Sequence, residues 1–384
     1  MSRTLQFILF FSIAFILYTA LNLYIFLKAW GVVPTEYRTW FVIGYVFLAY
    51  SYIGGRFLER VTLTWTTSAL VFIGAYWLSA MVYFFMIIYV IDVLRLINTF
   101  FPFFPSIITT NIALTEQIVA FSSIGVVVLV LTAGHFNARQ FRVKTLELTI
   151  SKNSNPLKSL NVVVASDIHL GTIICKSRLE HIIEKINALN PDLVLLPGDV
   201  VDEDLGPVIK QNLGETLRTI KSKFGVVACT GNHEYIGGVE EAYRYLTEHG
   251  INVLRDAAVR VADSLYVVGR EDRAIRQFAG RQRKPLDELM AGVDKNYPVI
   301  LMDHQPAHLE EAVLHGVDLQ LSGHTHHGQL WPFNFITKKM YELSWGYKLK
   351  EQTHFYVSSG VGTWGPPIRT GNRPEIVHVK LNFQ

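Results

Sequence analysis

Long apolar runs separated by short polar segments fill the N-terminal third of the chain. A helix needs about 20 apolar residues to cross a bilayer, and most of these runs approach or exceed that length. The first run also lacks the short apolar core and small-residue cleavage site of a removable signal peptide. We therefore expect an all-α transmembrane domain, residues 1–136, with about four helices. The runs are Leu5–Leu27, Trp40–Gly55, Ala69–Ile91 and Gln117–Gly134.

The number and direction of the spans depend on the weakest run and on the loop charges. The second run is short, so three or five spans are alternatives. The prolines and aromatic residues of Ile97–Ile108 favour a segment at the membrane interface. Lysine and arginine near span ends favour the cytoplasmic side, which places both termini and the following domain in the cytoplasm if four helices span. With four spans, the side of the termini would carry Arg3, Arg56, Arg60, Arg139, Arg142 and Lys144. The opposite side would carry only Lys28, Arg38 and Arg95.

From residue 145 the pattern changes to short apolar runs that alternate with charged, helix-like stretches such as Lys176–Leu189. Each apolar run ends in a cluster of polar residues, which is typical of a buried strand that leads into a functional loop. This alternation predicts a layered α/β domain, residues 145–384, with ligands beyond the carboxyl ends of the strands. The expected strands lie within Asn161–Asp167, Asp192–Asp199, Gly225–His233, Tyr297–His304 and Asp318–His324.

Composition narrows the class of protein and its partners. Half of the residues are hydrophobic (50%), which is too many for an ordinary soluble protein and makes the lipid bilayer an expected partner. The formal net charge of +3 gives no broad basic surface, so we expect no nucleic-acid partner. Cys175 and Cys229 lie far apart and do not form a disulfide framework. The oligomeric state is left open.

The polar clusters at the strand ends carry carboxylate, amide and imidazole groups. Because neighbouring parallel strands end at one edge of a sheet, these groups are predicted to meet. Oxygen and imidazole donors without thiolate suit Mn²⁺, Fe or catalytic Zn²⁺ better than a structural zinc cage. The number of donors matches two metal ions about 3.5–4 Å apart that share a carboxylate. These groups belong to the clusters Asp167 and His169, Asp199 and Asp202, Asn232 and His233, His304, and His324 and His326.

Taken together, the motifs DxH, GDxxD, GNHE, a single histidine and GHTH resemble those of the calcineurin-like metallophosphoesterase family, over residues 145–384. The resemblance implies a two-sheet β-sandwich flanked by helices and two divalent metal ions, with Mn favoured and Fe or Zn possible. It also implies a shared ligand. One ion would bind Asp167, His169, Asp199 and His326, and the other Asp199, Asn232, His304 and His324.

The resemblance implies further roles at the same place. His233 would assist the leaving oxygen of the phosphate, and Asp202 would orient a ligand or a bound water. Attack by a hydroxide bridging the two ions would need no covalent intermediate. Two positions depart from the common pattern: Glu234 replaces a frequent aspartate, and His327 a frequent glycine. We expect His327 to be an exposed loop residue rather than a substrate contact.

Two later segments bear on the substrate. After His326 the chain becomes aromatic, and Trp331 and Phe333 are candidates for contact with lipid; the alternative is that they pack beneath a neighbouring helix. The segment Ser358–Glu375 resembles a membrane-anchored branch of the family. Within it, Arg369 or Arg373 is expected either to bind phosphate or to close a structural salt bridge.

The favoured function is a membrane-bound dimetal phosphoesterase that hydrolyses a phosphate ester or diester. A lipid or lipid-linked substrate, such as a phospholipid or a UDP-diacylglucosamine-like glycolipid, fits the membrane domain best. One alternative is a tethered phosphatase or phosphodiesterase for small soluble phosphoesters. The other is a non-catalytic membrane scaffold, which the presence of all seven donors and His233 disfavours.

Overall fold

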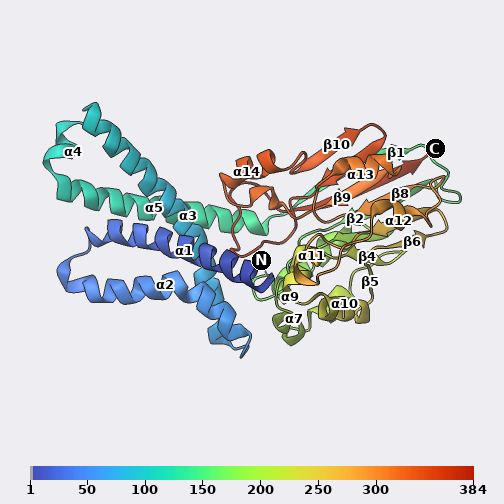
Figure 1. Ribbon diagram of the computed structural model, residues 1–384, viewed down its shortest axis with the longest axis horizontal. Helices are drawn as coiled ribbons and strands as arrows, with labels where there is room; N and C mark the ends of the chain where they lie inside the picture. The colour runs from blue at the N-terminus through green and yellow to red at the C-terminus, as the bar shows by residue number, and fades with distance from the viewer. Residues whose placement is uncertain (1–2) are drawn as a thin grey trace. The chain divides into compact units, whose positions relative to one another are not determined.

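The computed structural model describes residues 3–384; residues 1 and 2, where the predicted first domain starts, lie outside the described residues. The chain divides into two compact units, Met1–His135 and Phe136–Gln384. The first is helical, and the second contains every strand of the described chain (Figure 1).

Four helices of the described residues are long and apolar enough to cross a membrane, which confirms the number expected from the sequence. The weak second run, Trp40–Gly55, forms a full-length helix because polar residues extend it at both ends. The third helix also continues through the first residues of the predicted interfacial segment, up to Phe100. The helices are α1 (Arg3–Trp30), α2 (Arg38–Glu59), α3 (Trp65–Phe100) and α5 (Ile112–Arg139), with η1 (Thr35–Tyr37) and α4 (Ser106–Thr110) between them.

Glycines allow α2 and α3 to approach closely. A Cβ atom at Gly74 would lie 2.1 Å from the backbone nitrogen of Tyr52, and one at Gly55 would lie 2.8 Å from that of Val71. Small residues serve this purpose in membranes, where helices associate through tight packing rather than through the hydrophobic effect. The contact between these two helices therefore requires glycine at both positions.

The second unit contains two six-stranded mixed sheets, as expected of a two-sheet sandwich. In the first sheet β2 to β5 run parallel, while β12 pairs antiparallel with β2 and parallel with β1. Its order is β1 (Arg142–Ile150), β12 (Glu375–Phe383), β2 (Ser159–Val164), β3 (Leu193–Pro197), β4 (Val226–Cys229) and β5 (Ile251–Leu254).

The second sheet has a parallel centre and antiparallel edges. Strands β7, β8, β9 and β11 run parallel, and the antiparallel strands β6 and β10 close the two sides. Its order is β10 (Gly346–Lys350), β11 (Thr353–Val357), β9 (Leu319–Ser322), β8 (Val299–Met302), β7 (Leu265–Gly269) and β6 (Ala257–Val261).

Alternating side chains divide the apolar core into layers. Val162 and Val164 of β2 pack in the same cluster as Ile300 of β8, so this cluster lies between the sheets. Val163 points the opposite way and packs with helical residues such as Ile182. Because successive side chains of a strand face opposite sides, continuous apolar strands can be covered on both faces.

Helices cover the outer face of each sheet. Those with side chains in the outer core of the first sheet are α6 (Lys176–Ala188), α7 (Gly206–Lys210), α8 (Leu213–Leu217) and α10 (Val239–Glu248). The second sheet packs against α12 (Leu286–Met290) and α13 (Leu309–Leu314). The remaining short helices follow strands or loops: α9 (Asn232–Gly237), α11 (Ile275–Phe278), η2 (His326–Gly328) and α14 (Phe333–Met340).

We predict that Gly74→Val lowers the apparent Tm of the detergent-purified protein by about 2–10 °C, because the new side chain has no room against α2. Gly54→Val is the matched control: it places the same side chain on α2, where a Cβ atom would meet nothing within 4 Å. Thermal unfolding followed by circular dichroism measures both. Equal Tm values for the two variants would contradict the packing described here.

Candidate metal centre

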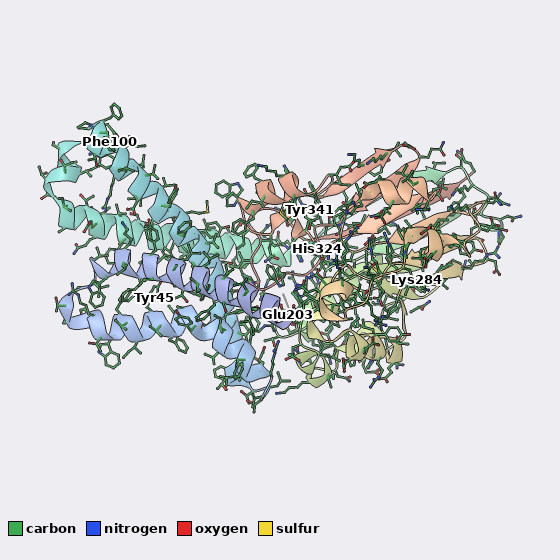
Figure 2. All side chains as sticks on the ribbon, in the orientation of Figure 1. Tyr45, Phe100, Glu203, Lys284, His324 and Tyr341 are labelled. Atoms are coloured by element: carbon green, nitrogen blue, oxygen red, sulfur yellow. The ribbon has the colours of Figure 1, made fainter. Side chains whose placement is uncertain are left out.

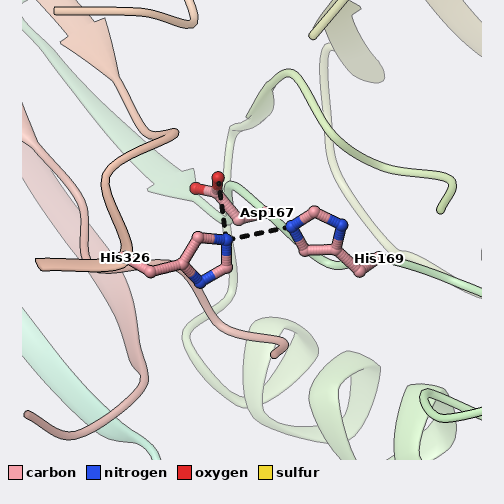
Figure 3. A group of neighbouring side chains, drawn as sticks. All are labelled: Asp167, His169 and His326. Carbon is pink, nitrogen blue, oxygen red and sulfur yellow. Dashed lines mark hydrogen bonds and ion pairs between the residues drawn. The ribbon is translucent and has the colours of Figure 1, made fainter. Parts of the chain in front are cut away.

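The loop after β2 and the loop after β9 bring three buried donors together. His326 Nε2 lies 3.0 Å from His169 Nε2 and 3.5 Å from Asp167 Oδ1 (Figure 3). One donor atom from each residue lies within 4.8 Å of the others, so the three face a common point. A single cation at this point could contact all three.

A second set of donors lies where β3, β4, β8 and β9 end. His304 Nε2 is 3.0 Å from Asp199 Oδ2 and 3.2 Å from Asn232 Oδ1. His324 Nδ1 is 2.8 Å from the same Asn232 oxygen. The amide oxygen therefore faces two imidazoles, and all four side chains surround one small region.

Asp199 joins the two sets. Its Oδ2 atom lies 3.0 Å from His304 Nε2 in the second set and 3.8 Å from His169 Nε2 in the first. The structure thus brings all seven predicted donors together and places Asp199 between the two groups. This is the arrangement that a carboxylate shared by two cations requires.

The backbone of these loops adopts an uncommon conformation. Left-handed φ angles occur at Asp167 (54°), His169 (54°), Asp199 (51°), His324 (70°) and His326 (44°). Such angles cost non-glycine residues on the order of 1–3 kcal/mol each and cluster at functional sites, where surrounding structure enforces them. These uncommon angles thus occur at residues whose donor atoms lie close together.

Two glycines leave room for the donors. Gly198 has a φ of +83°, and a Cβ atom there would lie 2.5 Å from His304 Nδ1. At Gly231 a Cβ atom would lie 2.2 Å from Asp199 Oδ1. The glycines of the GDxxD and GNHE motifs are therefore needed because donor side chains occupy the space beside them.

The surroundings of His324 and His326 lower the pKa values of their imidazole rings. Burial, together with the charge of His304, lowers the pKa of His324 to about 3. Burial also holds the pKa of His326 well below its usual value, with a further contribution from His169. Both rings are therefore neutral near pH 7, which is the form that binds metal.

His304 and Asp199 form an oppositely charged buried pair. Burial would lower the pKa of His304, but the Asp199 carboxylate outweighs it and holds that pKa well above the usual value. Burial would likewise raise the pKa of Asp199, but His304 and His233 hold it well below the usual value. The Asp199 carboxylate thus favours positive charge beside it, and a divalent cation would supply that charge.

The surroundings of Asp167 Oδ2 indicate whether a metal cation fits the site. Asp167 is fully buried, and its Oδ2 atom has no hydrogen-bond partner among the described residues. Burial raises the pKa of this carboxyl group, and the charge of Asp199 raises it further. A buried carboxylate is costly unless it is paired or coordinates a metal, so the donor set fits a cation at this point.

The predicted catalytic and orienting residues lie beside the donors. His233 Nδ1 is 3.1 Å from Asp202 Oδ1, and the same oxygen is 3.6 Å from His169 Nδ1. The His233 backbone N–H donates to Asp199 Oδ1 at 2.9 Å. Asp202 therefore contacts both a candidate metal ligand and the candidate acid.

Glu234 has a role that the sequence analysis missed. Its buried carboxylate accepts three backbone N–H bonds: from Gly231 at 2.7 Å, Asp199 at 3.1 Å and Val201 at 2.9 Å. It thereby fixes the loop that carries Asp199 to the loop that carries Asn232. The available signal was the glutamate three residues into a helix that begins after Gly231, which is the position of a capping box.

The two candidate phosphate-binding arginines lie in different environments. Arg369 is fully buried (0% exposed), and its guanidinium donates to the carbonyl oxygens of Gly360 and Gly362. It also lies 3.1 Å from His326 Nδ1, and because arginine can only donate, this bond holds the ring with Nε2 toward Asp167. Arg373 is exposed.

His327 differs from expectation. It is buried (7% exposed) rather than an exposed loop residue. Its ring lies 5.2 Å from that of Trp345, and Nδ1 lies 3.3 Å from the Ser344 hydroxyl. The loop folds back onto the segment before β10, so packing explains this histidine.

Aromatic side chains stand beside the donors. The ring of Tyr341 lies 6.2 Å from that of His324 (Figure 2), and the ring of Trp364 lies 6.0 Å from that of His233. Trp364 was missed by the sequence analysis, which singled out only the two arginines of this segment. Trp364 is also half exposed (53%), so it forms part of the rim of the site.

The predicted lipid-contact residues are exposed. Trp331 is 48% and Phe333 39% exposed, and further apolar side chains of α14 accompany them. They do not pack beneath a neighbouring helix. We call this group the aromatic surface, and it consists of Trp331, Phe333, Phe335, Ile336 and Met340.

Comparison with known proteins indicates the same family as the motifs do. The profile of a family described as calcineurin-like phosphoesterase matches residues 160–328. A zebrafish (Danio rerio) protein called transmembrane protein with metallophosphoesterase domain is 32% identical over 274 residues, which are 67% of this chain and 62% of that one.

Two bacterial proteins are also similar. An uncharacterized metallophosphoesterase of Aquifex aeolicus is 32% identical over 257 residues, 66% of this chain and 97% of that protein. One of Helicobacter pylori is 33% identical over 230 residues, 58% of this chain and 60% of that protein. The chain thus matches about three fifths of the zebrafish and Helicobacter proteins and nearly all of the Aquifex protein.

We predict that Glu234→Gln weakens Mn²⁺ binding about 10–100-fold, because an amide nitrogen cannot accept the backbone N–H bonds that position Asp199. Isothermal titration of the detergent-purified protein measures the affinity. Glu248→Gln, an exposed glutamate at the end of α10, is the matched control and should bind as the unchanged protein does. Equal affinities in the two variants would refute the positioning role.

Proposed function

Because the chain belongs to the calcineurin-like phosphoesterase family, we propose that it is a membrane-bound, metal-dependent hydrolase of phosphate esters or diesters. The observation that carries this proposal is the position of Asp199, whose Oδ2 atom lies 3.0 Å from His304 Nε2 and 3.8 Å from His169 Nε2. A carboxylate so placed between two donor sets is what a two-cation centre needs.

The proposed ligands divide between two cations in the way that the family resemblance implies, with Asp199 shared. When bound, two divalent cations lower the pKa of a water and offset the charge of the phosphoryl oxygens. Mn²⁺ is the proposed metal because the donors are oxygen and imidazole without thiolate, and Fe or Zn²⁺ would also fit. One set is Asp167, His169, Asp199 and His326; the other is Asp199, Asn232, His304 and His324.

His233 is the proposed proton donor to the leaving oxygen. Burial lowers its pKa, but Asp199 and Asp202 outweigh burial and raise the pKa to about 9. A cation at Asp199 would offset part of that effect, whereas the contact with Asp202 Oδ1 at 3.1 Å would remain. Asp202 would thus keep His233 protonated near neutral pH and aim its ring at the substrate.

We propose a lipid or lipid-linked substrate, such as a phospholipid or a UDP-diacylglucosamine-like glycolipid. The support is the aromatic surface, which is exposed. Lys338 and Lys339, in the last turn of α14, add positive charge beside it. Apolar side chains with a basic fringe suit the boundary between headgroups and acyl chains. Trp364 and Tyr341 at the rim offer apolar contacts closer to the donors.

We predict that the detergent-purified protein with Mn²⁺ depletes one phosphorus-containing class from a total lipid extract. Mass spectrometry follows the lipids. The Asp199→Ala variant should deplete none, because it removes the carboxylate shared by both donor sets. A protein that hydrolyses bis-p-nitrophenyl phosphate but no lipid would instead be a tethered phosphodiesterase for soluble substrates. One that hydrolyses neither would be a non-catalytic scaffold.

A variant of the aromatic surface separates lipid recognition from catalysis. Trp331→Ser combined with Phe335→Ser should slow lipid hydrolysis at least about tenfold, because each removed ring forfeits roughly 1.5–3 kcal/mol of apolar burial in lipid. The soluble diester should be hydrolysed at the unchanged rate. If both substrates slow equally, the aromatic surface does not select lipid.

We also propose that the catalytic unit faces the cytoplasm. Lysine and arginine are more numerous on the side of the chain termini in a four-span arrangement, and four helices of the described residues are long enough to span. We predict that a C-terminal green fluorescent protein fusion is fluorescent in a bacterial host, whereas a C-terminal alkaline phosphatase fusion is inactive. The reverse pattern would place the unit outside.

A further inference from the structure

The membrane unit contains a cavity of about 610 Å³ bordered by α1, α2, α3 and α5. Ligand sites typically measure about 300–1,000 Å³ and are mostly apolar with a few polar groups. The apolar part of this cavity is rich in aromatic rings. These are Trp40, Phe41, Tyr45, Trp77 and Phe84.

A buried polar group fixes two of these rings. Asn22 is almost fully buried (3% exposed); its side-chain oxygen accepts from Trp77 Nε1 at 2.9 Å, and its backbone oxygen accepts from the Tyr45 hydroxyl at 2.7 Å. These bonds satisfy the polar ends of both rings away from the lipid. Their apolar faces are thereby held along the cavity wall.

Four charged side chains also border the cavity. Lys28 Nζ lies 2.6 Å from Asp92 Oδ2, which links α1 to α3. Arg95 Nη2 lies 3.5 Å from Glu116 Oε1, which links α3 to α5. All four lie just beyond the ends of the predicted apolar runs, at the level where lipid headgroups are expected. Neither pair is fully buried, so each retains accessible donor or acceptor atoms.

One of these pairs borders a second cavity. A space of about 450 Å³ along α3, α4 and α5 is also lined by Arg95 and Glu116. The Arg95–Glu116 pair, whose charged atoms are 3.5 Å apart, thus borders two apolar cavities. We call it the loose pair. An amphiphile with its polar group at this pair could place apolar chains in both.

We propose that this cavity binds a zwitterionic phospholipid. Its phosphate would lie at Lys28 and Arg95, its ammonium at Asp92 and Glu116, and an acyl chain among the aromatic rings. The two cations and two anions sum to zero, so a zwitterion leaves no charge uncompensated, whereas a net anionic headgroup leaves one. This site goes beyond the proposed function, because it assigns a ligand to the membrane unit whatever the enzyme hydrolyses.

The test compares two lipids on the full-length protein. After delipidation in detergent, native mass spectrometry measures binding of phosphatidylethanolamine, a zwitterion, and phosphatidylglycerol, an anion with the same chains. We predict a one-to-one complex with phosphatidylethanolamine and a preference of at least about tenfold, equivalent to about 1.4 kcal/mol. Equal binding of the two lipids, or no binding of either, overturns the proposal.

Variants locate the site. Gly44 lines the cavity, and a Cβ atom there would meet nothing within 4 Å, so Gly44→Phe should fill the space and reduce phosphatidylethanolamine binding about tenfold. Gly54→Phe, at an equally open position of α2 that does not line the cavity, should bind as the unchanged protein does. Retained binding in Gly44→Phe, or equal loss in both variants, would refute the location.

If Gly44→Phe fails to fold, a double charge variant tests the proposed headgroup site instead. Arg95→Gln with Glu116→Gln removes both charges of the loose pair and leaves the apolar wall unchanged. The preference for phosphatidylethanolamine over phosphatidylglycerol should fall to about threefold or less. An unchanged preference would overturn the assignment of the headgroup site.

Discussion

The catalytic unit depends on keeping one ionised carboxylate buried. Asp199 is 2% exposed, and burying a charge without partners costs several kcal/mol. Its neighbours offset that cost: the imidazoles of His304 and His169 face Oδ2, and the His233 backbone N–H donates to Oδ1. The loops from β2, β3, β4 and β8 must therefore close around Asp199. Glu234 ties two of them together through backbone N–H groups, without competing for the cations.

Both units hold polar groups in an apolar interior, but by different means. In the catalytic unit a two-sheet core excludes water and leaves the strand ends to carry the donors. In the membrane unit, Gly74 and Gly55 bring two helices together, and Asn22 satisfies the polar ends of Tyr45 and Trp77. Aromatic rings are present both beside the candidate metal centre and along the membrane cavity.

Local pattern explains the successes of sequence reasoning. Apolar runs such as Leu193–Pro197 become strands that are buried on both faces, and Gly198 marks where this strand ends. Because donors such as Asp167 and Asp199 directly follow strands, the family and the two-sheet fold could be predicted from motif order, and both are confirmed. The helix count could be predicted for a similar reason: a bilayer sets the length of a span.

The sequence by itself determined the candidate donor residues, the apolar strands that they follow and the number of long apolar helices, because each is a pattern of neighbouring residues. Only the tertiary structure decided what depends on distant segments. It paired β1 with β12 in register from Arg142 and Glu375, placed Arg369 beneath His326, buried His327 against Trp345 and gave Glu234 three backbone partners. Burial and hydrogen bonding between residues far apart in the chain are properties of packing, and no local pattern encodes them.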